Sequence, residues 1–323
     1  MTAHSGSKKA VYAALIGNLL IVVTKFIAAW LTGSSAMLSE GIHSLVDSGN
    51  EVLLLYGIRR ASRPADYTHP LGHGREIYFW SFVVAVLIFA LGAGVSLYEG
   101  VNHILRPEPI RNVTISYVVL GASALFEAAS WLVALRIFRR EKGRLGYFAA
   151  IRQSKDPTTF TVLFEDSAAL LGLLIAALGI TAAYVLNAPF FDGLASIGVG
   201  LVLAGTAVLL ARESKGLLIG ERALPDVEAS ITAAAAGDPD VQRVNGLVSV
   251  HTGPDQVVVG LSIEFQDTLT VTAVEACVER IEAQLRHSRP EVTTIFIKPQ
   301  SAETWQARQE MLMRTAPADP DTK

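Results

Sequence analysis

Charged residues are scarce in this chain: Asp, Glu, Lys and Arg make up 18% of its 323 residues, against roughly 25% in soluble domains. Hydrophobic residues make up 51%. The net charge of -3 says little about partners, because the charges are unevenly placed along the chain. A basic stripe with interleaved aromatic residues is also missing, which argues against a nucleic-acid-binding protein.

Cysteine is nearly absent as well. The single residue, Cys277, excludes an intrachain disulfide framework. It falls on the apolar face of an expected helix, so we predict a buried thiol that serves core packing.

Long apolar runs are abundant, and a membrane-spanning helix needs about 20 such residues. The sequence therefore predicts a membrane all-α domain over residues 1–212. Its N-terminal run lacks a small-residue cleavage site, which favours a first span over a signal peptide. A soluble bundle of very apolar helices is the alternative. Six stretches qualify as spans, at about 10–32, 37–60, 78–103, 114–138, 159–186 and 190–212.

Lysine and arginine gather on one side of these spans, and this bias sets the orientation of a membrane protein. Basic residues precede the first span and follow the second, fourth and sixth, whereas the opposite side has Arg106 and Arg111. Both termini are therefore expected in the cytoplasm. We further expect a bacterial plasma membrane, because no organelle-targeting extension precedes the first span.

From residue 213 the composition becomes that of a soluble domain. We expect this domain to cover 213–300 and to be followed by a partly disordered extension over 301–323. The pattern predicts the order helix, strand, strand, helix, strand, with Pro225 opening the first helix and the turn "TGPD" joining the first two strands. Thr272 and Glu275 have the spacing of a capping box at the start of the second helix.

The second apolar stretch carries a stripe of polar residues. At 100° per residue, Glu40, His43, Asp47 and Glu51 fall on one helix face, with Asn50 beside them. Ionisable groups inside a membrane cost about 2.5–3.5 kcal/mol each on insertion scales. They are kept where they face a cavity, an ion or one another. A hydrogen-bond network between helices, without a ligand, is the alternative explanation.

The fifth stretch offers partners for this stripe, because Glu165 and Asp166 stand side by side in it. Neighbours in sequence point 100° apart, so only one of them can face the stripe directly. Imidazole and carboxylate oxygens together suit Zn²⁺, Fe²⁺, Co²⁺ or Mn²⁺, and the lack of a nearby thiolate disfavours Cu(I). Glu40 and Glu127 are candidates for a proton path, whereas Lys25 and Asp192 are as open to a structural role as to a functional one.

The chain resembles the cation diffusion facilitator family, which exports zinc and related divalent cations. The resemblance rests on "GSSAMLSEGIHSLVDSGNEVLLLYG", "HPLGHGREIYFW", "YEGVNHILRPEPI" and "FEDSAALLG", and on six spans followed by an αββαβ tail. It implies a homodimer in the lipid bilayer, cytoplasmic ferredoxin-like tails that dimerise, and exchange of one metal ion for protons. His43, Asp47 and Asp166 match the positions of the family's transport site.

The sequence departs from the family at Val162, where the family's site has His or Asp. "EDSAALLG" and "HSLVDSGN" are similar to the branch of zinc-transporter-nine-like proteins. Glu165, Asn50 or water would have to replace the missing ligand.

The loop "ADYTHPLGHGRE" resembles the family's second, cytoplasmic metal site, with Asp66 and His73 on ligand positions. The alternative is that His69 and His73 only cap and pack this loop. In the tail, the positions where family members carry metal ligands hold Asn245, Leu261, Phe296 and Lys298. The tail is therefore expected to dimerise without metal.

These features predict a secondary active transporter, not an enzyme: a proton-coupled divalent-cation exporter that works by alternating access, with zinc as the leading substrate and no resident cofactor. The first alternative is a metal-binding regulatory or scaffold protein of the membrane that does not transport. An intramembrane metalloprotease is a further alternative, but the HExxH helix it needs is missing from the sequence.

Overall fold

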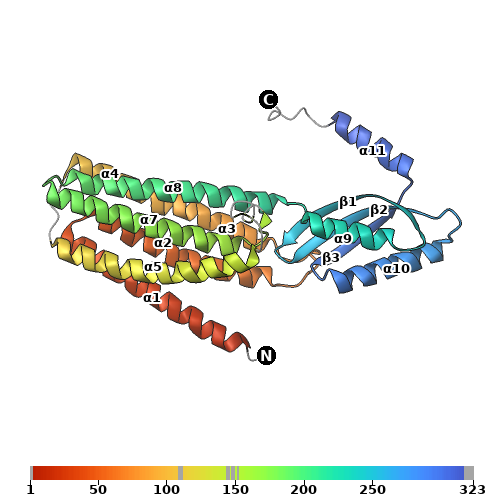
Figure 1. Ribbon diagram of the computed structural model, residues 1–323, viewed down its shortest axis with the longest axis horizontal. Helices are drawn as coiled ribbons and strands as arrows, with labels where there is room; N and C mark the ends of the chain where they lie inside the picture. The colour runs from red at the N-terminus through yellow and green to blue at the C-terminus, as the bar shows by residue number, and fades with distance from the viewer. Residues whose placement is uncertain (1–2, 108–111, 143–145, 147–149, 151–152, 316–323) are drawn as a thin grey trace. The chain divides into compact units, whose positions relative to one another are not determined.

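The computed structural model describes residues 3–107, 112–142, 146, 150 and 153–315. The chain divides into two compact units, one made of residues 1–63 and 75–218 and the other of residues 64–74 and 219–323. The first is helical and the second contains a small mixed sheet (Figure 1). Some of the basic residues counted for the predicted orientation lie outside the described residues, among them Arg144, which follows the fourth span, and Arg111, on the opposite side.

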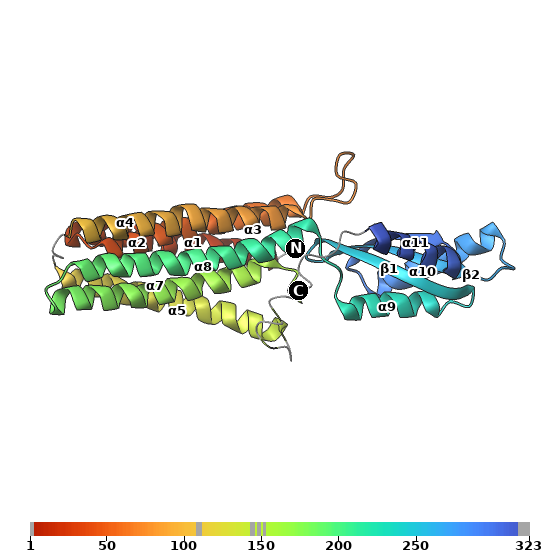
Figure 2. The same ribbon diagram turned by 90° about the horizontal axis from the view of Figure 1, so that it is seen from above.

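The helical unit is built from long helices that run side by side (Figures 1 and 2). The π-helical turn η1 joins α3 to α4, so that these three form one continuous helical segment, Glu76–Leu105. The elements are α1 (Ala3–Thr32), α2 (Ser35–Ala61), α3 (Glu76–Leu87), η1 (Ile88–Ala93), α4 (Gly94–Leu105), α5 (Val113–Glu141), α7 (Pro157–Val185) and α8 (Phe190–Ile219).

Four segments of the described chain are long and apolar enough to cross a membrane: Glu76–Leu105, Val113–Arg136, Phe160–Val185 and Phe190–Ile219. In α1, the apolar stretch Asn18–Thr32 is shorter. The helix α2 falls short because its polar stripe interrupts the apolar run. Within the described residues, composition thus identifies four of the six predicted spans, and the other two are those of α1 and α2.

Local sequence signals explain where the helices that carry the site begin. Gly33, at φ 70°, turns the chain between α1 and α2, a left-handed conformation that glycine adopts without strain. Ser34 then caps α2 by accepting a hydrogen bond from the backbone of Met37. Asp156 caps α7 in the same way ahead of Pro157, which suits the first helical position.

The helix α2 lies at the centre of the helical unit. It packs against α1, α3, α4 and α7, whereas α5 packs against α1 and α7. In both views α7 runs between α5 and α8 (Figures 1 and 2). A polar face on α2 is therefore turned into the bundle and shielded from lipid.

The second unit has the predicted element order. It contains α9 (Pro225–Ala236), β1 (Val241–Gly253), β2 (Gln256–Phe265), α10 (Val271–Ser288), β3 (Val292–Pro299) and α11 (Ala302–Thr315). The central strand β2 pairs antiparallel with β1 and parallel with β3. Alternate residues of β2 pack with α9 and α10 in one core, to which Cys277 belongs at 0% exposure, as predicted.

One prediction for this unit needs correction. Thr270, not Thr272, caps α10, because its side chain accepts the backbone N–H of Ala273. Thr272 lies inside the helix. Residues 302–315 of the extension form α11, a helix not predicted from the sequence, and its Trp305 lies against Gly246 of β1. Disorder is expected in the final residues of the extension, "TAPADPDTK", of which 316–323 lie outside the described residues.

The segment 64–74 belongs to the second unit although it connects α2 to α3. Its Gly74 approaches the turn between β1 and β2 so closely that an added Cβ would collide with Thr252 O and the side chain of Gln256. Glycine is required at this point, because any side chain would push the loop away from the sheet.

Candidate metal centre

The pair at the centre of the polar stripe is His43 and Asp47. The Nδ1 atom of His43 lies 3.3 Å from Oδ1 of Asp47, one helical turn away, and the His43 side chain is 2% exposed. Neither ring nitrogen of His43 makes a hydrogen bond within the described part of the chain, and the same holds for Asp47 Oδ1. Buried polar atoms are almost always hydrogen-bonded, so these bare atoms need an explanation.

The two acids of α7 point to different helices. Glu165 is 6% exposed, and its Oε1 accepts a hydrogen bond from Asn50 Nδ2 on α2 at 2.8 Å. Asp166 Oδ2 instead accepts from Ser130 Oγ on α5 at 2.8 Å. Both acids lie within coulombic range of Asp47. In this conformation Glu165, not Asp166, is the acid that contacts the helix of the stripe.

Packing against α5 fixes this rotation of α7. Val162, one turn before Asp166, packs against a buried cluster that includes Ala134 and Phe138 of α5. Val162 and Asp166 thus share the face of α7 that meets α5, while Glu165 lies on the face that meets α2. The rotation of α7 that turns Val162 toward α5 therefore also turns the extra acid, Glu165, toward α2.

The candidates for a proton path occupy different surroundings. Glu40 is 0% exposed and forms an ion pair with Lys25 of α1, with 3.2 Å between Oε2 and Nζ. Glu127 is half-buried on α5 and lies within coulombic range of Asp47. The contact between Glu40 and Lys25 escaped sequence reasoning, because helical spacing within α2 says nothing about which residue of α1 faces it.

Asp192 has a structural explanation. Its carboxylate accepts hydrogen bonds from Ser34 Oγ at 2.7 Å, from the backbone and hydroxyl of Ser35 at 2.6 and 3.0 Å, and from the backbone of Ala36 at 3.4 Å. It therefore binds the N-terminus of α2, where backbone N–H groups and the helix dipole favour an anion.

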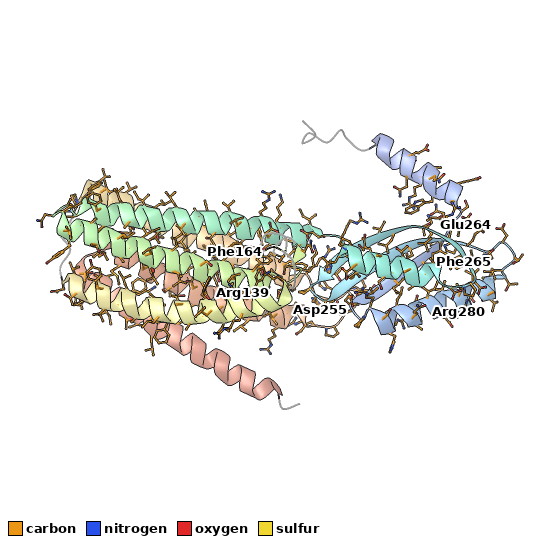
Figure 3. The ribbon with its side chains drawn as sticks, viewed as in Figure 1. Arg139, Phe164, Asp255, Glu264, Phe265 and Arg280 are labelled. Carbon is orange, nitrogen blue, oxygen red and sulfur yellow. The ribbon has the colours of Figure 1, made fainter. Side chains whose placement is uncertain are left out.

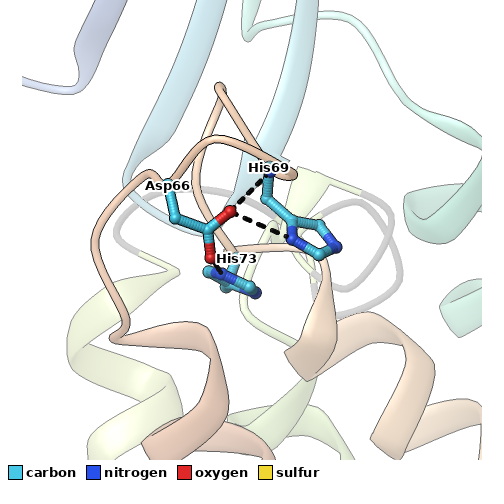
Figure 4. A group of neighbouring side chains, drawn as sticks. All are labelled: Asp66, His69 and His73. Atoms are coloured by element: carbon cyan, nitrogen blue, oxygen red, sulfur yellow. Dashed lines mark hydrogen bonds and ion pairs between the residues drawn. The ribbon is translucent and has the colours of Figure 1, made fainter.

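The loop residues Asp66, His69 and His73 come together, as Figure 4 shows. Asp66 Oδ2 lies 3.0 Å from His73 Nε2, and Oδ1 lies 3.4 Å from His69 Nδ1. One ligand atom from each residue lies within 4.8 Å of the others. Hydrogen bonds from Thr68 and His73 hold the pKa of Asp66 well below its usual range, so the carboxylate is charged at neutral pH.

A second such cluster, Asp238, Asp240 and Cys277, is already filled by a protein cation. Arg280, labelled on α10 in Figure 3, lies 2.9 Å from Asp238 and 2.6 Å from Asp240. The hydrogen bond from Arg280 lowers the pKa of Asp238 to about 2. Burial raises the pKa of Cys277 to about 11, which disfavours the thiolate that a metal needs.

These are the sets of three His, Cys, Asp or Glu found within 4.8 Å in the described chain. The α2 and α7 residues are not among them. The structure brings His43 next to Asp47, and Glu165 to Asn50, without closing a three-ligand shell.

Comparison with known proteins agrees with the sequence motifs. Residues 11–219 match the model of the cation efflux transmembrane domain. The proton-coupled zinc antiporter SLC30A9, mitochondrial, of Xenopus laevis is 36% identical over 80% of this chain and 47% of its own length, and the human protein is 34% identical over 80% and 46%. The cation-efflux pump FieF of Klebsiella pneumoniae strain 342 is 26% identical over 95% and 97%.

The chain thus spans about half the length of the SLC30A9 relatives. Since these relatives are named mitochondrial, they give no support to the expected bacterial plasma membrane. The matched domain covers well over half of this chain. The chain is an integral membrane protein and belongs to the cation efflux family.

Proposed function

We propose that this protein is a proton-coupled efflux transporter of divalent metal cations, with zinc as its principal substrate. The observation that carries the proposal is the His43–Asp47 pair, whose ligand atoms lie 3.3 Å apart inside the bundle and make no hydrogen bonds in the described chain. An imidazole nitrogen beside a carboxylate oxygen is a first-row metal ligand pair. The names of the SLC30A9 and FieF relatives support the same activity.

The metal would be held by His43 and Asp47 from α2 and by an acid from α7. Glu165 reaches α2 in this conformation, with Asn50 as its partner. Asp166 would join by breaking its hydrogen bond to Ser130 when α7 rotates. Both acids are therefore retained in the proposed site, with Glu165 as the replacement for the ligand missing at Val162.

Proton coupling follows from the ligands themselves. Metal binding requires a deprotonated carboxylate and a neutral imidazole, so it expels protons, and protonation from the opposite side releases the metal. Alternating access would come from rocking of the helices around this buried point. Glu40 and Glu127 would line the proton route.

We propose six spans, since α1 packs along α2 and buries its stripe, with both termini in the cytoplasm. Residues 1–212 would form the transport domain and 213–300 a ferredoxin-like domain that holds a homodimer together. The Asp66–His69–His73 cluster would be a second, cytoplasmic metal site.

Reconstitution in liposomes tests the activity. Purified protein is placed in vesicles that enclose a zinc dye and a pH dye, and zinc is added outside. Zinc entry with matching proton release supports the proposal, whereas zinc entry without any pH change refutes the coupling. Mn²⁺, Fe²⁺ and Co²⁺ are compared in the same vesicles.

A second candidate is a metal-responsive membrane protein that binds zinc without moving it. The absence of a ligand at Val162 favours it, because a three-ligand site can bind metal yet fail to cycle. Saturable zinc binding together with no zinc entry into the vesicles would establish this candidate and exclude the transporter.

A further inference from the structure

Lys25 is fully buried in α1, at 0% exposure, beside the polar stripe of α2. Its Nζ lies 3.2 Å from Glu40 Oε2 and donates to Ser44 Oγ at 2.7 Å. Glu40 and Ser44 are one helical turn apart, so the ammonium bridges the residues on either side of His43. A lysine inside a membrane protein is costly, and it is retained where an anion compensates it.

Only one of the two carboxylate oxygens of Glu40, Oε2, contacts Lys25. Its second oxygen, Oε1, is buried and makes no hydrogen bond in the described part of the chain. Gly172 of α7 leaves the room for it, because an added Cβ there would stand 2.5 Å from Oε1. Glu40 thus lies where α1, α2 and α7 meet, with an oxygen available to a cation.

The charges of the pair act on the site in opposite directions. Lys25 interacts electrostatically with His43 and with Asp47. Its positive charge opposes a divalent cation between them, while the negative charge of Glu40 attracts one. Because the two charges are in contact, their effects on the cation nearly cancel as long as both are present.

We propose that Lys25 is a tethered counter-cation of the transport site. It neutralises Glu40, so that the transported ion is held at His43 and Asp47 and is bound loosely enough to be released. Lys25 and Glu40 are positioning residues rather than ligands. This inference rests on the proposed function and names two residues that set the affinity of its site.

The two residues of the pair should have opposite effects on zinc affinity when each is neutralised. Full-length protein is reconstituted in nanodiscs with Asp66→Ala and His73→Ala, which removes the loop cluster, and zinc affinity is measured by calorimetry. Lys25→Met should tighten zinc binding by about tenfold or more, and Glu40→Gln should weaken it by about as much. The double variant should return to within about threefold of the background. Ser44→Ala removes a hydrogen bond but no charge, and should leave the affinity unchanged.

A pair that only braces the helices would behave differently: both single variants would weaken zinc binding, and the double variant would be no better. Either result overturns the inference. If Lys25→Met does not fold, the double variant decides: zinc affinity within about threefold of the background supports the inference, and affinity as low as that of Glu40→Gln overturns it. Zinc binding that survives Asp47→Ala in the same background would instead refute the proposed site itself.

Discussion

Two polar clusters on α2 are built in opposite ways. At the N-terminus of the helix, both carboxylate oxygens of Asp192 accept hydrogen bonds from the first turn. In the middle of the helix, His43 and Asp47 leave three buried atoms bare in the described chain. A cluster that holds the fold together satisfies its own atoms, and unsatisfied buried atoms are what the proposed ion site would need.

The largest effect should come from emptying the open cluster. Asp47→Ala combined with Asp166→Ala should reduce zinc entry into vesicles to the background of empty liposomes, because two of the proposed metal ligands and their two charges are lost. Folding should not suffer, since neither carboxylate forms a direct ion pair with a lysine or arginine in the described chain. Size-exclusion profiles and unfolding temperature serve as controls. Normal transport by this variant would mean that the stripe is structural.

The satisfied cluster should respond in the reverse sense. Asp192→Ala leaves two backbone N–H groups and two hydroxyls of the α2 start without an acceptor, at about 1–3 kcal/mol for each group that stays unsatisfied. We expect a marked fall in unfolding temperature in detergent. The fraction that folds should keep its affinity for zinc, and a selective loss of affinity at unchanged stability would contradict the comparison.

Glu165 tests which face of α7 belongs to the open cluster. Glu165→Gln keeps a hydrogen-bonding side chain beside Asn50 but removes the charge, so zinc affinity should fall sharply if Glu165 is a ligand. Val162→His is the matched variant, because position 162 packs against α5 in this conformation. It should change the affinity little. A strong gain from Val162→His with no effect of Glu165→Gln would assign the site to the other face.

The two clusters of the second unit differ in the same way: Arg280 satisfies the acids of the Asp238 cluster, whereas no lysine or arginine forms an ion pair with the Asp66 cluster in the described chain. In the Asp47→Ala background, the remaining zinc should bind at Asp66, His69 and His73, and His73→Ala should abolish it. Asp238→Asn should leave it intact, because Arg280 already occupies that cluster. Calorimetry measures the number of zinc ions bound per chain. Loss of the remaining zinc ion in Asp238→Asn would show that the Asp238 cluster, not the Asp66 cluster, binds it.

The smallest effect is a pH dependence of stability. The pKa of Asp238 is lowered from 3.8 to about 2. Its contribution is therefore fully present above pH 4 and is lost as the pH falls toward 2. Arg280→Ala should lower the unfolding temperature slightly at pH 7 and flatten its fall over the acid range, so that parent and variant converge near pH 2. Parallel acid limbs for parent and variant would show that the pair contributes nothing.

Much of this arrangement follows from local sequence. Helical spacing places His43 beside Asp47, and a proline, a turn and alternating residues locate α9, β1 and β2. The directions in which Glu165 and Asp166 point could not be predicted, since they depend on how α7 packs against α5, for example through Val162 and the cluster that holds Ala134. The pairing of Lys25 with Glu40 could not be predicted either, since it depends on how α1 packs against α2. Thr270 and Thr272 compete as caps, and only the backbone decides between them.

The placement of residues 64–74 with the tail has a consequence for the continuity of the chain. A protease that cuts after Ile219 would separate the tail from α8, yet the loop between α2 and α3 would still lie against the β1–β2 turn through Gly74. The cut tail would then stay with the membrane fragment as a non-covalent complement. The loop is thus an anchor that the membrane domain contributes to the fold of the soluble one.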